Sequence, residues 1–443
     1  MTVPTEASGD RISNFHTHVV NGLRVLDSAP TVGSPFFRSN HDLLAPRIGF
    51  AWDVSGSGKM AVRGGFGMFY DPIESEFRFY TPNNPPFFRL LQVTNPPFPL
   101  GFAGGTGAAS RTAPDAIDFE LRAPTRIQYN VNVQRQVTAS TLFNIGYVGS
   151  HSYHLTRLQD ANPTVFRIQP DGTKLYQVGG PRLNPDLAGS RFISSDADSF
   201  YNSLQMDFTQ RLSHGLRYKV SYTFAKNIDE VSAANSDQAL SAPNDTQDPY
   251  NRRADRGLSN NDSRNNVVMN LTYDLPWNSL AGWKGKLMGG WQLGTIASFA
   301  NGQPFTASTG FNQSGDQQNT LADRVSLRPG ANNNPVLGGP DQYFDPAVFV
   351  LPPAGTYGNL GRNTLIGPGL ANVDLSFVKA TTLSERLKMD FRAEFFNTLN
   401  HANFSLPNSQ IFSPNGQIVG SAGRISATKT TSRQIQFALK LIF

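Results

Sequence analysis

The chain has 443 residues, including 40 glycines and 30 prolines, and only 16% of its side chains are charged. This many helix-breaking residues disfavours long helices, and no apolar run reaches the roughly 18 residues of a membrane-spanning helix, which excludes a helical membrane protein. The net charge of +5 comes from scattered lysines and arginines, so nucleic acid is not an expected partner. The absence of cysteine excludes disulfides and any cysteine-based metal site or nucleophile.

The first residues of the chain, 1–14, are polar and lack the basic start and apolar core of a secretory signal. We therefore expect either a cytoplasmic protein or a chain that begins within a longer one. Residues 1–44 form a loop-like N-terminal segment in this prediction, and residues 45–443 form one β-region.

Alternation of apolar and polar residues with a period of two is the dominant pattern of the β-region, and it predicts strands of about ten residues. The clearest strands are expected at 127–137, 216–224, 267–275, 387–396 and 433–443. Weaker ones are expected near 46–54, 60–70, 141–149, 202–211, 290–300 and 371–379. The fold class is therefore all-β, with about 11 to 13 antiparallel strands.

The links between these strands alternate between short and long. Short links such as 55–59 and 213–215 fit tight turns, whereas the others are long and rich in Pro, Gly, Asn and Asp. All short turns then lie at one end and all long loops at the other, which is the layout of an outer-membrane up-and-down β-barrel. A tilted strand crosses the membrane with about 9 to 11 residues, which matches the pattern. Extracellular loops are expected at about 71–125, 150–200, 226–264, 301–370 and 400–431.

A soluble β-sandwich is the alternative fold, because its strands also alternate. The polar faces favour the barrel, since they carry mainly Asn, Gln, Ser, Thr and Gly, which suit a crowded lumen better than bulk water. Aromatic residues flanking one short turn, namely Tyr273, Trp277, Trp283 and Trp291, fit an interfacial girdle. The polar side chains expected to face the lumen are Gln128, Asn130, Asn132, Gln134, Lys388, Asp390, Arg392 and Glu394.

The number of strands predicts that the barrel is incomplete. If the last residue ends on the short-turn side, the strand near 46–54 starts on the long-loop side. The number of strands between these two points is then odd, whereas a closed barrel formed by one chain has an even number of strands. Residues 18–26 could add a weak strand, although they contain a central Asn-Gly. We expect the chain to be the C-terminal part of a larger barrel.

Several segments, in this order, resemble the C-terminal barrel of TonB-dependent outer-membrane transporters, specifically the Oar-like subgroup with an N-terminal carboxypeptidase-regulatory-like domain. They include VRGGFGMFYD (62–71), YNVNVQRQ (129–136), GWQLGTIASFANGQPFT (290–306), FRAEFFNTLNHANF (391–404) and RQIQFALKLIF (433–443). The resemblance covers most of residues 45–443.

This resemblance implies a barrel of 22 strands around a plug, which takes up a large or scarce ligand with energy delivered by TonB. The chain departs from the family pattern in lacking a recognisable plug, TonB box and about half of the strands, so the TonB system would act through that missing N-terminal region. The alternating C-terminal strand looks like the signal read by the outer-membrane assembly machinery, carried here by Phe437, Leu439, Leu441 and Phe443. The expected partners are outer-membrane lipid, the assembly machinery, the TonB system and an unidentified ligand.

Other motifs give weaker signals. His16 with His18, and His151 with His154, could seed metal sites, but no further ligands stand near them. Asp390, Arg392 and Glu394 could act as acid and base partners, although an ion-pair ladder with Lys388 inside the lumen is the preferred interpretation. Gly64, Gly65 and Gly67 are expected to allow close packing within a strand, because no helix follows to form a phosphate site. Asn244–Asn266 is rich in Asp and Asn and could bind Ca²⁺, but it has no known ligand spacing.

Two hypotheses for function follow. The first is the barrel portion of a TonB-dependent receptor, located in the outer membrane, with no enzymatic activity and no cofactor. The second is a surface or adhesion barrel that displays the same loops without transport.

Overall fold

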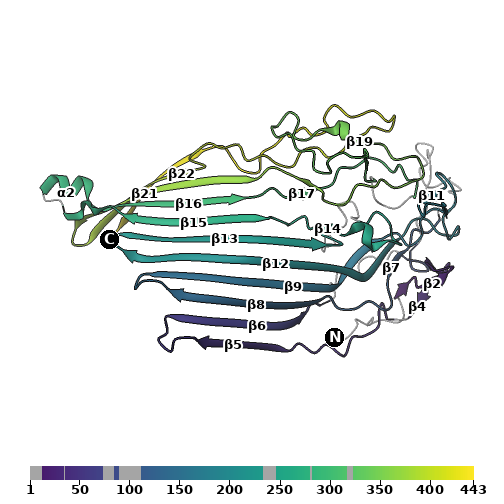
Figure 1. Cartoon of the computed structure of the whole chain (residues 1–443), viewed down its shortest axis with the longest axis horizontal. Helices are drawn as coiled ribbons and strands as arrows, with labels where there is room; N and C mark the ends of the chain where they lie inside the picture. Colours follow the sequence, from purple (N-terminus) through teal and green to yellow (C-terminus); the bar gives the residue numbers. More distant parts are fainter. Residues whose placement is uncertain are drawn as a thin grey trace.

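The computed structural model describes residues 12–33, 35–72, 84–88, 111–232, 246–279, 282–316 and 323–443. Within these ranges all eleven expected strands are present, each paired antiparallel with the next one in the chain (Figure 1). They are β5 (Arg47–Asp53), β6 (Met60–Tyr70), β8 (Thr125–Gln136), β9 (Thr141–Gln159), β12 (Arg191–Ser213), β13 (Leu216–Asp229), β15 (Asn265–Asp274), β16 (Trp291–Ala300), β21 (Leu370–Ser384), β22 (Leu387–Phe396) and β23 (Gln434–Ile442).

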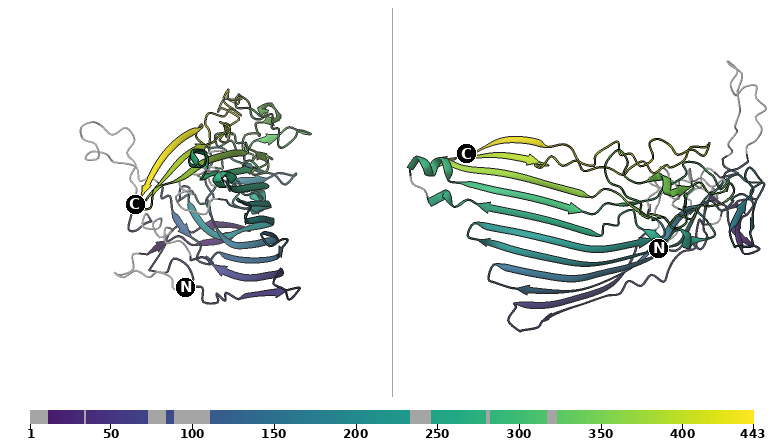
Figure 2. Two further views of the ribbon diagram at one scale, coloured as in Figure 1. Left: turned by 90° about the vertical axis from the view of Figure 1, so that its left-hand side faces the viewer. Right: turned by 45° about the horizontal axis from the view of Figure 1, so that its top comes forward.

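Two short strands extend the sheet to 13 strands. β7 (Asp115–Ile117) pairs parallel with the start of β12, and β14 (Gly257–Leu258) pairs with the end of β13. The sheet is curved and open, because β5 and β23 each have a partner on one side only among the described residues (Figure 2). The predicted all-β, antiparallel up-and-down architecture is confirmed, and the strands of the described ranges do not close into a barrel.

The register sorts the side chains of the sheet into two faces, since cross-strand partners point to the same side. From β6 to β21, one continuous row of partners is polar except for Ala61 and Val268, and its other members are Gln134, Asn144, Asp207, Ser221, Ser298 and Asn372. The adjacent row, on the opposite face, consists of Val62, Val133, Ile145, Met206, Tyr222, Val267 and Phe299. The sheet therefore has a polar face and an apolar face along its whole width.

The apolar face is not covered by a second layer. Val131 is 44% exposed, Phe299 43% and Leu439 62%. A soluble sandwich would bury such a face against a second sheet. The buried hydrophobic clusters instead lie in the connecting segments, where Phe305, Phe344 and Leu365 pack in the largest cluster.

The long links gather at the end of the sheet opposite the short turns (Figure 1). We call their described residues, 111–124, 160–190, 230–232, 246–264, 301–316, 323–369 and 397–433, the loop cap. Its small elements are β10 (Phe166–Ile168), β11 (Lys174–Tyr176), β17 (Pro304–Phe305), β18 (Ser326–Leu327), β19 (Phe349–Val350), β20 (Leu365–Ile366), η4 (Arg252–Asp255) and η6 (Pro346–Val348). At the short-turn end lie η5 (Pro276–Ser279) and the helix α2 (Gly282–Met288).

Several strands are longer than expected, and β9 and β12 exceed their expected lengths the most. β9 and β12 have 19 and 23 residues and pair with each other as far as Gln159 and Phe192, well inside the segment expected to be a loop. The outer ends of β9 and β12 therefore extend into the region of the loop cap.

The described part of the N-terminal segment, residues 12–33 and 35–44, does not add a strand to the main sheet. It folds as β1 (Ser13–Asn14), β2 (Thr17–Val20), β3 (Leu23–Leu26) and β4 (Thr31–Val32), paired only with one another. Asn21 and Gly22 have φ of 50° and 81°, so they form the tight turn of a two-residue hairpin between β2 and β3. The possible single strand at 18–26 is thus wrong, since these residues form both strands and the turn of a separate small hairpin.

Candidate ligand site in the loop cap

A cavity of about 740 Å³ lies in the loop cap, where links that are distant in the sequence meet. The β10–β11 hairpin forms one wall, residues 247–254 a second, and residues 324–326 with 353–361 a third. Ligand pockets commonly have volumes of about 300–1,000 Å³, so this cavity is large enough for a small-molecule ligand.

The hairpin wall is held in place by an ion pair and by cation–π contacts. The Lys174 ammonium lies 2.6 Å from both carboxylate oxygens of Asp248. It also lies 5.1 Å from the ring centres of Phe166 and of Tyr250, which is within cation–π distance. Because Asp248 is only 5% exposed, the ion pair supplies the charge that this buried carboxylate needs.

Tyrosine hydroxyls join the hairpin to the third wall. The Tyr357 hydroxyl is 2.9 Å from the Tyr176 hydroxyl and donates to Asp316 over 2.8 Å. The backbone N–H of Tyr176 donates to the Gly355 carbonyl over 2.7 Å. Burial raises the pKa of both tyrosines, so both hydroxyls stay protonated at neutral pH and serve as fixed donors.

A buried charge network supports the floor of the cavity. Arg324, which lines the cavity, pairs with the fully buried Asp255 and donates to the Ala254 carbonyl over 2.7 Å. Arg362 donates to the Asp255 carbonyl over 2.6 Å and pairs with Asp229 at the end of β13. The network therefore ties the long link before β21 to the strand ends.

A second part of the network lies at the outer ends of β9 and β12. Arg157 forms a bidentate pair with Asp196, at 3.1 and 2.8 Å. Its third nitrogen is 4.0 Å from Asp255. Burial raises the pKa of Asp255 more than the neighbouring cations Arg324 and Arg157 lower it, so the pKa is about 6.

The lining of the cavity combines polar and apolar groups, and its charges are nearly balanced. Lys174 is neutralised by Asp248 and Arg324 by Asp255, while Asp171 accepts hydrogen bonds from Thr173. The uncharged polar groups of the lining include Gln169, Gln247, Asn251, Ser326, Thr356 and Asn359. Such a lining suits a polar ligand held by hydrogen bonds rather than by a net charge.

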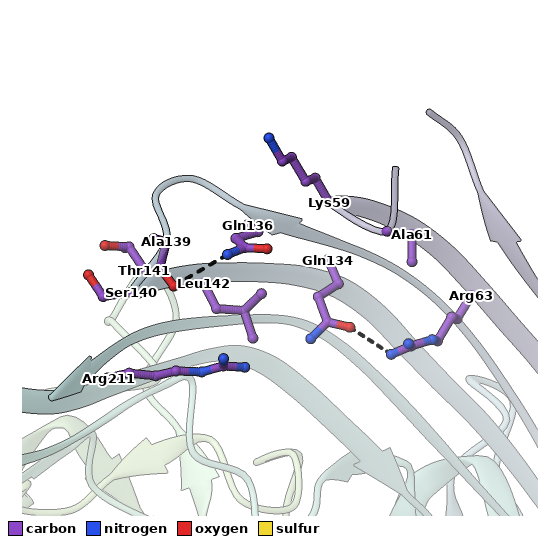
Figure 3. Close-up of a pocket in the computed structure, with 11 residues that line it drawn as sticks. Lys59, Ala61, Arg63, Gln134, Gln136, Ala139, Ser140, Thr141, Leu142 and Arg211 are labelled. Carbon is purple, nitrogen blue, oxygen red and sulfur yellow. Dashed lines mark hydrogen bonds between the residues drawn. The ribbon is translucent and has the colours of Figure 1, made fainter. Parts of the chain in front are cut away.

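A smaller pocket of about 170 Å³ lies on the polar face of the sheet, near the short turns. Figure 3 shows that Arg63 of β6 and Gln134 of β8 point toward one another, while Lys59 points away. The Arg63 guanidinium donates to the Gln134 amide oxygen over 2.6 Å. The polar face thus forms its own hydrogen bonds between strands.

The residues expected to face the lumen share this polar face. Glu394 is opposite Ser376 and Gln436, and Asp390 is opposite Lys440. The set on β22 therefore lies on the same side of the sheet as Gln128, Asn130, Asn132 and Gln134 on β8. In the described part of the chain no salt bridge joins Lys388, Asp390, Arg392 and Glu394 to one another, so the expected ion-pair ladder is not formed.

The C-terminal signal residues Phe437, Leu439 and Leu441 alternate on the apolar face of β23, opposite Ala393, Phe391 and Met389. Phe443 follows the end of β23 and is 97% exposed. The recognition of these side chains by an assembly machinery remains a prediction.

The weaker motifs have local roles. His151 stacks on Phe200 with ring centres 4.1 Å apart, and His18 lies 2.7 Å from Asp27. Within the described ranges, no group of three or more His, Cys, Asp or Glu side chains could hold a metal ion. The possible Ca²⁺ loop begins at residues 244–245, which lie outside the described ranges. Gly64 faces the ring of Phe50, where a side chain would collide, in agreement with close packing of strands.

The sequence alone did not identify the cavity residues. Lys174, Asp248 and Tyr357 are separated by more than 70 residues from one another, as in the Lys174–Asp248 pair with a separation of 74. No periodicity or motif links them. The excess of Asp, Asn and Gly in the long links was the only signal that these segments could be functional.

Comparison with known proteins supports the fold. Residues 1–436 match the family described as the outer membrane beta barrel domain. No curated protein sequence matches the chain significantly. In the described ranges no helix is long and apolar enough to cross a membrane.

Several solved structures align with most of this chain. The outer membrane transporter YddB from Escherichia coli has a TM-score of 0.48 and 8% identity, and the alignment covers 95% of this chain and 42% of that one. The FrpB iron transporter from Neisseria meningitidis has a TM-score of 0.41 and 10% identity, with 95% and 40% covered. The ferric-catecholate import receptor Fiu from E. coli has a TM-score of 0.40 and 11% identity, with 96% and 37% covered. This chain spans about two fifths of the length of each.

Proposed function

The chain belongs to the outer membrane beta barrel domain family and is located in the outer membrane, and on this premise we propose that it is the barrel portion of a TonB-dependent receptor of the Oar-like subgroup. In this proposal the loop cap contacts the ligand, the polar face lines the lumen around a plug, and the apolar face contacts lipid. The segments that resemble the Oar-like barrel, from 62–71 to 433–443, support the assignment to the subgroup.

The observation that carries the proposal is the ligand-sized cavity at the long-loop end of the two-faced sheet. Three long links supply its walls, and buried ion pairs connect those walls to the strand ends. A barrel with short, unconnected loops would have no comparable site. Because most of the polar groups in the cavity lining are uncharged donors and acceptors, we propose a polar, uncharged ligand and no enzymatic step.

The proposal includes partner strands beyond this chain. Among the described residues, β5 and β23 each have one edge without a partner strand. In hydrocarbon such an edge would leave backbone N–H and C=O groups without hydrogen bonds, at a cost of several kcal/mol per group. A larger barrel, with additional strands between these two edges, removes that cost. The proposed complete barrel has 22 strands, with this chain as its C-terminal half.

The test compares uptake in three strains of the source bacterium: the wild type, a deletion of the gene for this protein, and a deletion of tonB. Depletion of compounds from a complex medium is followed by mass spectrometry. We expect both deletion strains to lose depletion of the same compounds. Depletion that requires this protein but persists without TonB would refute the transporter proposal, and so would identical depletion in all three strains.

A cavity variant links this uptake to the loop cap. Thr356→Val with Asn359→Leu replaces two neutral polar groups of the lining by apolar groups of similar size. Uptake of the identified compound should fall at least tenfold at an unchanged level of barrel in the outer membrane. The matched control is Asn332→Leu, which changes an amide of the same link outside the cavity lining and should leave uptake unchanged. Normal uptake by the cavity variant would place the ligand elsewhere.

A further inference from the structure

The helix α2 projects beyond the strand ends at the short-turn end, on the side of the molecule opposite the loop cap (Figures 1 and 2). It belongs to the link between β15 and β16, and its sequence is GWKGKLM. None of its residues is buried. A helix of seven residues is too short to be stable alone, so its position must be set by contacts with the sheet.

Two side chains of the sheet hold the C-terminal end of α2. The Lys379 ammonium on β21 donates to the carbonyls of Lys286, Leu287 and Gly289 at 3.1, 2.8 and 2.8 Å. The Trp291 indole N–H donates to the Leu287 carbonyl over 3.2 Å. A cation at a helix C-terminus is favourable, because the last carbonyls lack partners within the helix.

These two side chains also show on which side of the sheet α2 is attached. Lys379 is opposite Trp291 on one neighbouring strand and Phe391 on the other, and Phe391 is opposite Leu439. The row therefore belongs to the apolar face, which contacts lipid in an outer-membrane barrel. The helix is consequently fixed on the lipid side of the sheet, at the level where the strands end.

The exposed surface of α2 has the composition of a membrane interface. Trp283 is 70% exposed and Leu287 62%, and their spacing of four residues places them on the same side of the helix. Lys284 and Lys286 are also exposed, and the helix contains no acidic residue. Tryptophan and lysine are typical of the headgroup region, where an apolar ring and a cation can both be accommodated.

From this arrangement we infer that α2 is an interfacial anchor that binds the phospholipid leaflet at the short-turn end of the barrel. Trp283 and Leu287 insert toward the acyl chains, and Lys284 and Lys286 contact lipid phosphates. The bound partner is the lipid surface itself. This inference depends on the outer-membrane fold but not on the transport proposal.

The test uses the absence of cysteine in the chain, which allows single-site spin labelling. The label is placed at Trp283→Cys in the complete protein, reconstituted in vesicles of phosphatidylethanolamine and phosphatidylglycerol. The matched control is Ile168→Cys in β10, since Ile168 is 69% exposed and Trp283 70%. A second control, Val131→Cys, reports on the apolar face of the sheet.

Relaxation by oxygen and by a water-soluble nickel chelate then measures the depth of each label. We expect the label to be relaxed more strongly by oxygen than by the nickel chelate at positions 283 and 131, and more strongly by the nickel chelate at position 168. Water exposure at 283 with lipid exposure at 131 would overturn the anchor while leaving the barrel in place. Water exposure at both sites would overturn the assignment of the apolar face as well. Protection at 283 only in native membranes would indicate a protein partner and would also overturn the lipid assignment.

The lysines are tested in the same background. Raising the share of phosphatidylglycerol should move the label at 283 deeper, and Lys284→Gln with Lys286→Gln should abolish this dependence. An equal dependence with and without the two lysines would contradict their contact with lipid phosphates.

Discussion

The facing of the sheet can be tested at one strand, β23, where the two faces alternate residue by residue. Leu439 is 62% exposed and lies one residue from the centre of β23 at Ala438. If β23 crosses the membrane over its nine residues, Leu439 is close to the bilayer midplane. An arginine near the midplane on the lipid face costs about 2–4 kcal/mol, which corresponds to a decrease in the folding equilibrium constant of roughly 30- to 700-fold.

The matched substitution is Gln436→Arg, which lies on the opposite face of the same strand. Gln436 is directly opposite Glu394, so a cation there gains a neighbouring carboxylate and remains within reach of water. We expect a change within about 0.5 kcal/mol, as for surface substitutions away from special features.

The assay is a denaturant titration of the complete protein folding into vesicles, followed by tryptophan fluorescence and by the mobility shift of the folded barrel on gels. The two midpoints should separate, with only Leu439→Arg shifted to lower denaturant. Equal shifts for the two variants, or a larger shift for Gln436→Arg, would refute the assignment of the two faces.

Three further predictions concern the C-terminus and the loop cap. Phe443→Ala should lower the amount of folded barrel in the outer membrane several-fold on heat-modifiability gels, whereas an unchanged amount would remove Phe443 from the assembly signal. Lys174→Met leaves the buried Asp248 without its cation, at a cost of about 3–5 kcal/mol, so the β10–β11 hairpin should become sensitive to protease. Adding Asp248→Asn removes the unpaired charge and should restore protease resistance. Cleavage of the double variant as fast as the single variant would contradict this role of the ion pair. Burial raises the pKa of Asp323 to about 6, whereas the carboxyl in the unfolded chain has its ordinary pKa of 3.8. The folded state therefore gains stability from protonation of Asp323 as the pH falls from about 6 to about 4, and gains no more from this group at lower pH. Asp323→Asn should therefore reduce the difference in protease resistance of the loop cap between pH 7.5 and pH 5, and an undiminished difference would assign the pH dependence to other groups.

The strands could be predicted from the sequence because alternation is a local property. Each of the eleven strands needed only its own ten or so residues, and the alternation of short and long links then determined their order. The ends of β9 and β12 could not be predicted, since they continue by pairing with each other outside the membrane-length pattern. The Asn-Gly at residues 21 and 22 counted against a single strand at 18–26, but the separate hairpin that these residues form was not predicted.

The sequence by itself determined that this protein is an antiparallel sheet with one polar and one apolar face, because a strand turns successive side chains to opposite sides whatever surrounds it. Only the tertiary structure decided which loop residues meet. The pairs Lys174–Asp248, Arg324–Asp255 and Arg362–Asp229 join links 69 to 133 positions apart. The structure also decided that Lys379 holds α2 on the apolar side of the sheet. Such contacts depend on the path of the whole chain, and no local pattern of residues encodes them.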